Sequence, residues 1–506
     1  MTELPATLGA LKKAALRDPS LRARTVKQEL RDGLVARLAA GASLEELFPG
    51  IHGYGETVLP QVANAILAGH DILLLGLRGQ AKTRLARCIP QLLDEQTPML
   101  AGDPLRSHPL APIGDVAERL VATQGDAARV EWLGRDQRYG EKLATPDVSV
   151  ADLIGDVDPI RAQRDGVDLG DMRAVTFGIV PRTNRGVFCI NELPDLAPRI
   201  QVALFNILEE NDVQVRGIPL RLPLDLLLVF TANPEDYTSR GQIVTPLKDR
   251  IGAQILTHYP RSRAEGVVIQ RQEAQLSGGA GVEPVIHPLF HDLIEEAARA
   301  ARSSEYVDQA SGVSARLTIA ALEALQANVL RRGLTTGTKQ PRARLTDLPA
   351  VLMAMTGKVE LAYEGEQEGP AKVGWHLLGE AVKNLWAERL PPPIREDQDE
   401  RESGPWKEVL AWFAAGHKVE LSDRSTDQQH AEALASVAGL AKAVDAQLKP
   451  AKDERLLMQE FVLEGLFHGG ALARDDSARG LVYSDLLATL MTGKRKKGRD
   501  ERESRF

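Results

Sequence analysis

The chain has 506 residues, 43% of them hydrophobic and 26% charged, which is typical of a soluble globular protein of about two to four domains. Its formal net charge of -8 makes nucleic acid an unfavourable partner, because the overall field repels a polyanion. Cys88 and Cys189 are far apart and in no CxxC, which argues against a disulfide framework and a zinc site. The sequence has neither a signal-peptide pattern nor a membrane-spanning apolar run, so we expect a cytoplasmic protein without membrane contact.

Helical periodicity opens the chain and then gives way to an alternation of strands and helices. Apolar positions recur at helical spacing over residues 8–48, and a further amphipathic helix is predicted over residues 59–67, ended by Gly69. Four short apolar runs are typical of buried parallel strands: "ILLL" from Ile72, "VFCI" from Val187, "LLLVF" from Leu226 and "AQIL" from Ala253. Because helical stretches lie between them, we predict a parallel α/β core.

Beyond Pro260 the strand pattern fades and helical periodicity returns, as in "PLFHDLIEEAARAAR" and "SARLTIAALEALQANVLRRG". A proline-rich, charged stretch then predicts a linker, and after it one short strand is a candidate at "KVEL". The final "GKRKKGRDERESRF" lacks the apolar content needed to fold. The predicted organisation is an N-terminal helical segment (1–48), an α/β core (49–262), a helical domain (263–390), a linker (391–405), a helical C-terminal region (406–492) and a disordered basic tail (493–506).

The segment "GLRGQAKT", residues 76–83, predicts a phosphate-binding loop between a strand and a helix. It matches G-x-x-x-x-G-K-[ST] except that Ala81 replaces the second glycine. The loop's backbone N–H groups would cradle phosphates, Lys82 would reach the β and γ phosphates, and the Thr83 hydroxyl would bind Mg²⁺. Alanine still supplies an N–H, provided that position 81 has a negative φ or bears a modest left-handed cost. The predicted ATP-binding residues are Gly76, Arg78, Gly79, Gln80, Ala81, Lys82 and Thr83.

The alternative is a glycine-containing β–α turn that binds no nucleotide, and the next motif argues against it. In "RGVFCINELPDL" a buried strand leads into Asn191 and Glu192. Glu192 has the place of a general base that polarises the attacking water. Asn191 stands where an aspartate is expected; its amide can orient a metal-bound water but brings no negative charge. We therefore expect weaker Mg²⁺ binding or slower turnover than with an aspartate.

Three further polar residues are candidates for the same site. Asn233 ends the strand "LLLVFTAN", where it can position water against the γ-phosphate. Arg250 lies in "LKDRI", and Arg316 lies in "SGVSARLT" at the start of a helix. A single arginine is usually a solvated surface residue, so these two gain meaning only from the pattern around them.

In order and spacing, these segments resemble the AAA+ ATPases of the clade that contains the magnesium chelatase ATPase subunit and the MoxR ATPases. The resemblance covers residues 45–385 approximately and includes "ATPDVSVADLIGDVDP", "GIVPRTNRGVFCINEL", "VQVRGIPLRLP" and "FTANPEDYTSRG". It implies a P-loop α/β core, an all-helical lid, and a homo-hexameric ring with ATP and Mg²⁺ between subunits. The roles that it implies are catalysis by Glu192, a first sensor at Asn233, an arginine finger at Arg250 with Arg240 as a competing candidate, and a second sensor at Arg316.

Two segments look like insertions of this clade, which contact the client at the pore or axial surface of the ring. One is residues 152–159 and the other is "VQVRGIPLRLP". The second has independent support, because "VQV" and "LRL" alternate with period two around Gly-Ile-Pro, as in a hairpin.

Three functions stay open at this point. The first is a MoxR-type motor that remodels a protein client, beside a partner with a von Willebrand A domain. The second is the ATPase subunit of a magnesium chelatase, which drives metal insertion into a porphyrin. The third is a nucleotide-gated scaffold with little hydrolysis, which Asn191 motivates. A sigma-54 activator is disfavoured because the G-A-F-T-G-A loop is absent.

Overall fold

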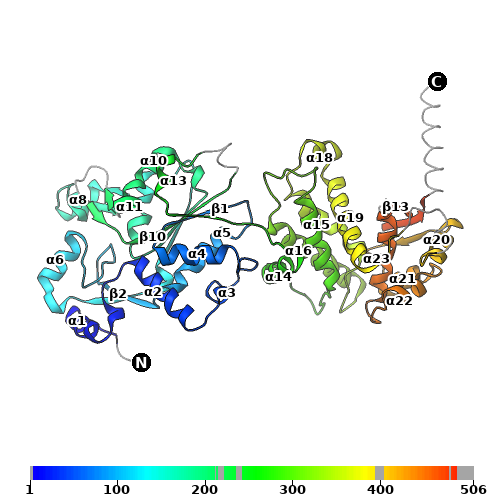
Figure 1. Ribbon diagram of the computed structural model, residues 1–506, viewed down its shortest axis with the longest axis horizontal. Coiled ribbons are helices and arrows are strands. Elements are labelled where there is room, and N and C mark those ends of the chain that lie inside the picture. The colour runs from blue at the N-terminus through cyan, green and yellow to red at the C-terminus, as the bar shows by residue number, and fades with distance from the viewer. Residues whose placement is uncertain are drawn as a thin grey trace, which may run out of the picture. The chain divides into compact units, whose positions relative to one another are not determined.

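The computed structural model describes residues 4–210, 212–214, 221–234, 242–393, 404–477 and 480–486. The chain divides into two compact units, Met1–Tyr259 and Pro260–Phe506 (Figure 1). Arg240, the turn of the second expected hairpin, most of the expected linker and the basic tail lie outside the described residues. Within the described part of the chain, no helix combines the length and apolar character needed to cross a membrane.

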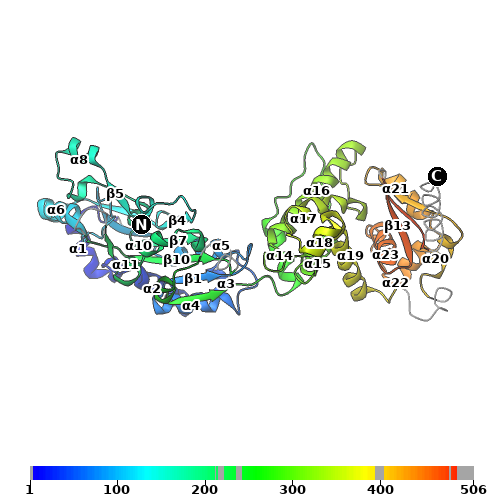
Figure 2. The same ribbon diagram turned by 90° about the horizontal axis from the view of Figure 1, so that it is seen from above.

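A five-stranded parallel sheet forms the centre of the first unit. Figure 2 shows β4, β7, β10 and β1 side by side, and β11 completes the order β11-β1-β10-β7-β4. The strands are β1 (Ile72–Leu75), β4 (Tyr139–Leu143), β7 (Gly186–Asn191), β10 (Leu226–Ala232) and β11 (Ala253–Leu256). The four predicted strands are confirmed. The edge strand β4 was not predicted, because "YGEKL" has no continuous apolar run.

Alternating side chains of each strand pack into two separate hydrophobic cores, one on each face of this sheet. Ile72 and Leu74 of β1 pack with α2 (Val26–Ala39), α4 (Val58–Ala68) and α5 (Lys82–Cys88). Leu73 and Leu75 pack on the opposite face, against α10 (Pro198–Ala203), α11 (Phe205–Glu210) and α13 (Thr245–Arg250) (Figure 1). This three-layer arrangement places the carboxyl ends of β1, β7 and β10 at one edge, where ligands of such sheets bind.

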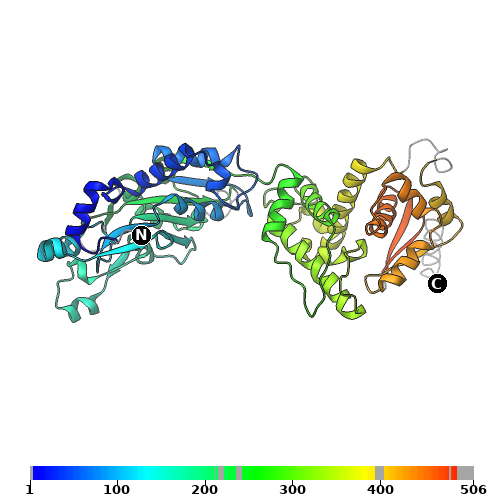
Figure 3. The ribbon, with the colours of Figure 1, turned by 90° about the horizontal axis from the view of Figure 1, so that it is seen from below.

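The N-terminal segment is an integral part of the first unit. Its helices are α1 (Leu8–Arg17), α2 and α3 (Leu44–Leu47), and Figure 3 shows these blue helices lying along the α/β part. Glu29 of α2 accepts two hydrogen bonds from the buried Arg138, at 2.6 and 2.7 Å. The Val26 amide donates to Asp225 at 2.8 Å. Since Asp225 immediately precedes β10, α2 supports the end of the sheet away from the phosphate loop.

The two expected insertions each contribute to an antiparallel strand pair. The first, residues 152–159, contains β5 (Gly155–Val157), and its partner β6 (Val175–Phe177) lies beyond the expected bounds, after α8 (Pro159–Asp165). In the second, β8 (Asp212–Gln214) pairs with β9 (Arg221–Pro223), which confirms the hairpin-like pairing. Further strands and α-helices of this unit are β2 (Gln96–Leu100), β3 (Val130–Gly134), α6 (Gly114–Gln124), α7 (Val150–Leu153) and α9 (Ile179–Arg182).

The second unit begins with the expected helices and continues into a mixed region. The helices before residue 393 are α14 (Arg263–Glu273), α15 (Pro288–Ala301), α16 (Ala315–Thr336), α17 (Pro349–Thr356), α18 (Tyr363–Glu368) and α19 (Pro370–Arg389). Those after residue 404 are α20 (Lys407–Ala414), α21 (Asp427–Ala435), α22 (Leu440–Gln447) and α23 (Arg455–His468). The candidate strand is confirmed as β12 (Val419–Leu421), and it joins an antiparallel sheet with β14 (Gly480–Asp485) and β13 (Leu472–Ser477) that was not expected.

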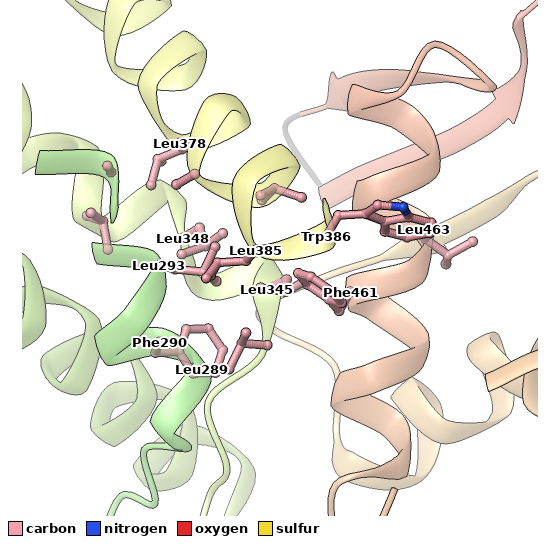
Figure 4. Close-up of a cluster of buried hydrophobic side chains, with 14 of the residues drawn as sticks. Leu289, Phe290, Leu293, Leu345, Leu348, Leu378, Leu385, Trp386, Phe461 and Leu463 are labelled. Atoms are coloured by element: carbon pink, nitrogen blue, oxygen red, sulfur yellow. The ribbon is translucent and has the colours of Figure 1, made fainter. Parts of the chain in front are cut away.

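The helices before and after the expected linker share one hydrophobic core. Figure 4 shows Trp386 of α19 facing Phe461 and Leu463 of α23, with Leu385 and Leu345 nearby. The rings of Trp386 and Phe461 lie 6.1 Å apart between centroids. The C-terminal region therefore packs on the helical domain and belongs to the same compact unit.

Candidate nucleotide site

The phosphate loop leaves β1 in a conformation that small residues allow. A Cβ atom at Gly76 would lie 2.0 Å from Thr257 Oγ1, so this position must be glycine. Gly79 has a φ of +73° and Ala81 a φ of +55°, both left-handed. Of the two possibilities for position 81, the structure has the costlier one, because Ala81 adopts the conformation that glycine tolerates freely. Helix α5 begins at the next residue, Lys82.

Lys82 lies inside the loop and is only 7% exposed. Its Nζ donates to the carbonyl oxygens of Leu77, at 2.9 Å, and of Gly76, and to Oδ1 of Asn233 at 2.6 Å. These acceptors are oxygens, as the phosphate oxygens of a nucleotide are. The residues present therefore fit a phosphate group, since the ammonium can exchange loop carbonyls for phosphate without a change in the chemistry of its partners.

Asn233 connects Lys82 to Glu192. Its Nδ2 donates to Oε2 of Glu192 at 2.9 Å, while its Oδ1 accepts from Lys82. The backbone of Glu192 is left-handed, with a φ of +55°, and its amide donates to Oγ1 of Thr231 at 3.0 Å. This unusual backbone turns the Glu192 side chain toward the strand ends, so three predicted residues from three segments meet in one hydrogen-bonded path.

Thr83 and Asn191 are also in contact. Oγ1 of Thr83 donates to Oδ1 of Asn191 at 2.9 Å, and Thr231 donates to the same oxygen at 3.2 Å. No group of three or more His, Cys, Asp or Glu residues in the described part of the chain could hold a metal ion. A few hard oxygen ligands beside a phosphate loop fit Mg²⁺, which proteins commonly bind together with the phosphates of a substrate.

Sequence reasoning missed Glu141, which lies on the unpredicted strand β4. Its carboxylate accepts from Nδ2 of Asn191 at 2.8 Å, from Arg87 at 2.8 and 2.9 Å, and from the Tyr139 hydroxyl at 3.0 Å. Burial raises the pKa of Glu141, but the hydrogen bonds from Arg87 and Tyr139 outweigh it and hold the pKa below its usual value. Glu141 therefore carries a negative charge beside Asn191 at neutral pH.

Tyr54 is a second residue without a sequence signal. Its hydroxyl donates to the carbonyl oxygens of Gln80, at 2.8 Å, and of His258, at 2.9 Å. The Gln80 side chain accepts from Thr257 at 2.7 Å. Tyr54 and Thr257 thus brace the phosphate loop from outside, and the isolated "GYGET" pattern around Tyr54 has no spacing that could indicate this.

The three predicted arginines lie on three different segments of the chain. Arg78 is exposed on the loop, and its carbonyl accepts from the Tyr259 hydroxyl at 2.9 Å. Arg250 ends α13, pairs with Glu209 at 2.8 Å, and lies over the Phe205 ring at 5.2 Å. Arg316 is exposed in the first turn of α16, in the second unit. The roles of Arg250 and Arg316 stay predictions.

No family model matches the chain, but individual proteins do. The chain is 26% identical over 234 residues to the magnesium-chelatase subunit ChlI of Nostoc sp., and the match covers 45% of this chain and 58% of that protein. The magnesium-chelatase 38 kDa subunit of Rhodobacter capsulatus is 29% identical over 248 residues, covering 47% of this chain and 65% of that protein. The chain thus spans about three-fifths of the curated relatives' length.

Among solved structures, a complex of subunits BchI and BchD of magnesium chelatase is 19% identical, with a TM-score of 0.34, over 63% of this chain and 98% of that chain. By its sequence relatives, its sheet order and its loop–helix cradle, the chain resembles the AAA+ ATPases of the clade that contains the magnesium chelatase ATPase subunits and the MoxR proteins.

Proposed function

We propose that this protein binds ATP with Mg²⁺ and hydrolyses it, as a ring-forming motor of MoxR type that remodels a protein client. The observation that supports this proposal is the hydrogen-bonded path from Lys82 through Asn233 to Glu192 at the carboxyl ends of the strands. It joins a phosphate-binding cation, a polar sensor and a carboxylate base, which are the groups that phosphoryl transfer to water needs.

Each residue has a role that follows from its chemistry. Lys82 and the N–H groups of the loop hold the phosphates, and Thr83, with Asn191 acting through water, holds Mg²⁺. The metal supplies positive charge that offsets the charge of the phosphates. Glu192 orients the attacking water and accepts its proton, while Asn233 holds the Glu192 carboxylate in place.

The ring and its arginines complete the proposal. In a homo-hexamer, Arg250 of one subunit would reach the nucleotide of its neighbour, and Arg316 would couple the helical lid to the same nucleotide. Loss of the γ-phosphate contacts on hydrolysis would then release the subunit interface and reshape the client. A partner with a von Willebrand A domain belongs to this proposal as the link to the client.

Magnesium chelatase is the alternative, because the named relatives are chelatase subunits. In it, the chain would drive metal insertion into a porphyrin through partner subunits. Between about a third and two-fifths of each relative lies outside the match, and residues 404–477 and 480–486 form a helical and β-sheet region packed on the helical domain. These observations favour the MoxR-type motor. Metal insertion by a chelatase reaction in which this protein replaces the ATPase subunit would favour the alternative.

The first experiment measures ATP turnover by the purified protein with Mg²⁺, beside the Glu192→Gln variant, together with oligomeric mass with and without nucleotide. We expect turnover that the variant loses by about 100-fold or more, since a positioned base contributes about that much. An ATP-dependent ring is expected for both proteins. Equal rates for the two proteins would contradict the motor, and nucleotide-dependent assembly without turnover would support the scaffold.

A further inference from the structure

A carboxylate stands directly behind Asn191, the residue that takes the place of the expected aspartate. Oε1 of Glu141 accepts a hydrogen bond from Nδ2 of Asn191 at 2.8 Å. The parallel pairing of β4 with β7 sets Leu143 opposite Asn191, so Glu141 lies two residues earlier on the same face of the sheet. The contact is therefore fixed by the register of two strands and not by a long side chain alone.

Glu141 decides which way the Asn191 amide points. An ionised carboxylate only accepts hydrogen bonds, so it must face the NH₂ group of Asn191, and the carbonyl oxygen then faces Thr83. Oγ1 of Thr83 is 2.9 Å from that oxygen. Without the carboxylate, either end of the amide could face Thr83, because a hydroxyl both donates and accepts.

The Glu141 carboxylate is itself held in place. Arg87 donates to both of its oxygens, at 2.8 and 2.9 Å, and the Tyr139 hydroxyl donates to Oε2 at 3.0 Å. Arg87 follows Thr83 by one turn on α5. A closed circuit of contacts thus runs from Thr83 through Asn191 and Glu141 to Arg87, and back to the helix that begins at the phosphate loop.

We propose that Glu141 is a positioning residue that supplies the negative charge missing at position 191 to the shell around Mg²⁺. It aims the Asn191 oxygen toward the place beside Thr83 and polarises the amide, so the oxygen binds a metal-bound water more strongly. This inference rests on the proposed function, because it assumes that Mg²⁺ binds there together with the nucleotide. Asn191 then does not indicate a weakened ATPase, because Glu141 on the neighbouring strand supplies the negative charge.

A plainer explanation is that Glu141 only forms an ion pair with Arg87. The Arg87 side chain is 60% exposed, and pairs of this kind contribute little to stability. The two explanations differ in a measurable way. A structural ion pair is lost equally when either partner is replaced, whereas a charge that serves Mg²⁺ is lost only when Glu141 is replaced.

The experiment measures binding of a fluorescent, non-hydrolysed ATP analogue to the full chain as Mg²⁺ is increased. For Glu141→Gln we expect the half-maximal Mg²⁺ concentration to rise about tenfold, as for residues that support metal ligands. Arg87→Gln should raise it by less than about threefold, on the same scale. Glu131→Gln, which removes one exposed charge from β3, should leave it unchanged. Thermal unfolding checks that the variants fold, and Glu141→Asp, which keeps the charge, is the second variant should Glu141→Gln unfold.

Asn191→Asp gives the decisive comparison. Alone, it sets two carboxylates in contact, which disfavours ionisation of both and limits any gain in Mg²⁺ affinity. Combined with Glu141→Gln it returns the charge to position 191, so Mg²⁺ affinity should recover about tenfold, and the two changes should not be additive.

Three results would overturn the inference: an unchanged Mg²⁺ dependence in Glu141→Gln, equal effects of Arg87→Gln and Glu141→Gln, or additive effects of the two substitutions. If Glu141→Asp is the variant available, a tenfold loss in it also counts against the inference. A wild-type chain that binds no analogue, or binds it without regard to Mg²⁺, would instead overturn the proposed function and this inference with it. The wild-type titration therefore separates the two failures.

Discussion

The two units each contain a buried polar network, and the two networks differ in what their charged groups contact. Lys82 in the first unit donates to two backbone carbonyls and an amide oxygen. Glu464 in the second unit accepts from Arg474 at 2.8 and 2.9 Å and from the Tyr483 hydroxyl at 2.6 Å. These three acceptors of Lys82 are oxygens that phosphate oxygens can replace, whereas the Glu464 carboxylate is paired with the Arg474 guanidinium of the same unit. Lys82 therefore lies in a candidate binding site, whereas the network around Glu464 has a structural role.

The network around Glu464 joins the C-terminal region to the helical domain. Glu464 lies on α23, Arg474 on β13 and Tyr483 on β14. The Arg474 guanidinium also lies over the rings of Trp375, on α19, and Phe467, at 4.5 Å from each. Burial raises the pKa of Glu464, but the His468 hydrogen bond and the Arg474 charge outweigh it and lower that pKa to about 2.

Arg250→Ala should produce the largest change. It tests whether a residue of the first unit also acts on the nucleotide of a neighbouring subunit. We expect turnover to fall by about 1,000-fold with nucleotide binding retained, since an arginine finger contributes at least that much. The fold should tolerate the change, because the Arg250–Glu209 pair is partly exposed and such pairs contribute about 0–1 kcal/mol. Steady-state ATPase assays and analogue binding measure the two effects.

Mixed rings provide the control for Arg250→Ala. A mixed interface is intact where the Arg250→Ala subunit supplies Glu192 and its Glu192→Gln neighbour supplies Arg250, so mixing should restore some turnover. Normal hydrolysis by Arg250→Ala would show that the finger assignment is wrong and would direct the same test to Arg240. Absence of recovery at every mixing ratio would count against a ring with arginines that act between subunits.

Lys82→Ala should come next in size and tests the first half of the comparison directly. It removes the cation that Asn233 and the loop carbonyls contact, so nucleotide affinity should fall by about 100-fold or more, as when a charge-assisted contact is lost. Analogue binding measures this loss. Wild-type affinity in Lys82→Ala would mean that the loop is a plain β–α turn. Lys82→Arg is the matched control, since it keeps the charge but cannot enter the loop in the same geometry.

The candidate site could be predicted from the sequence where its residues follow apolar strands. The sequence carried no signal where the residues are polar and buried. Strands β1, β7 and β10 are apolar runs, so Lys82, Asn191, Glu192 and Asn233 could be placed at their ends. The edge strand β4 is half polar and gave no strand signal, so Glu141 was missed with it. Strand β13 begins "LARDD", and Arg474 within it is buried by its pairing with Glu464. Periodicity treats such a charge as exposed, because the partner that neutralises it is distant in sequence.

Glu464→Gln tests the second half of the comparison. Its folded pKa of about 2 lies below the ordinary value of 4.5, so the ionised form stabilises the second unit by about 3 kcal/mol at neutral pH. That stabilisation is complete above the unfolded pKa and is lost as the pH falls from about 5 to 2. Urea unfolding followed by tryptophan fluorescence measures it well, since Trp375, Trp386, Trp406 and Trp412 lie in this unit.

The control for Glu464→Gln is nucleotide binding, which should not change if the two networks serve separate purposes. The variant should also show a flatter dependence of unfolding free energy on pH than the wild type between about pH 5 and 2. An equally steep dependence of the unfolding free energy on pH in the variant would mean that other carboxylates, and not Glu464, stabilise this unit. Weakened nucleotide binding would break the separation between the two networks.

Ala81→Gly should have the smallest effect. It tests whether the phosphate loop carries backbone strain, which the Glu464 network does not. The left-handed backbone at φ +55° costs alanine about 1–2 kcal/mol. Glycine avoids that cost but gains about 0.4–1 kcal/mol of entropy in the unfolded chain. The net expectation is a stabilisation of about 0.5–1 kcal/mol, measured by calorimetric unfolding, with analogue binding unchanged. Destabilisation by Ala81→Gly would mean that contacts of the alanine methyl group outweigh the strain. Stabilisation with tighter binding would instead show that the alanine at this position limits how well the loop holds a phosphate.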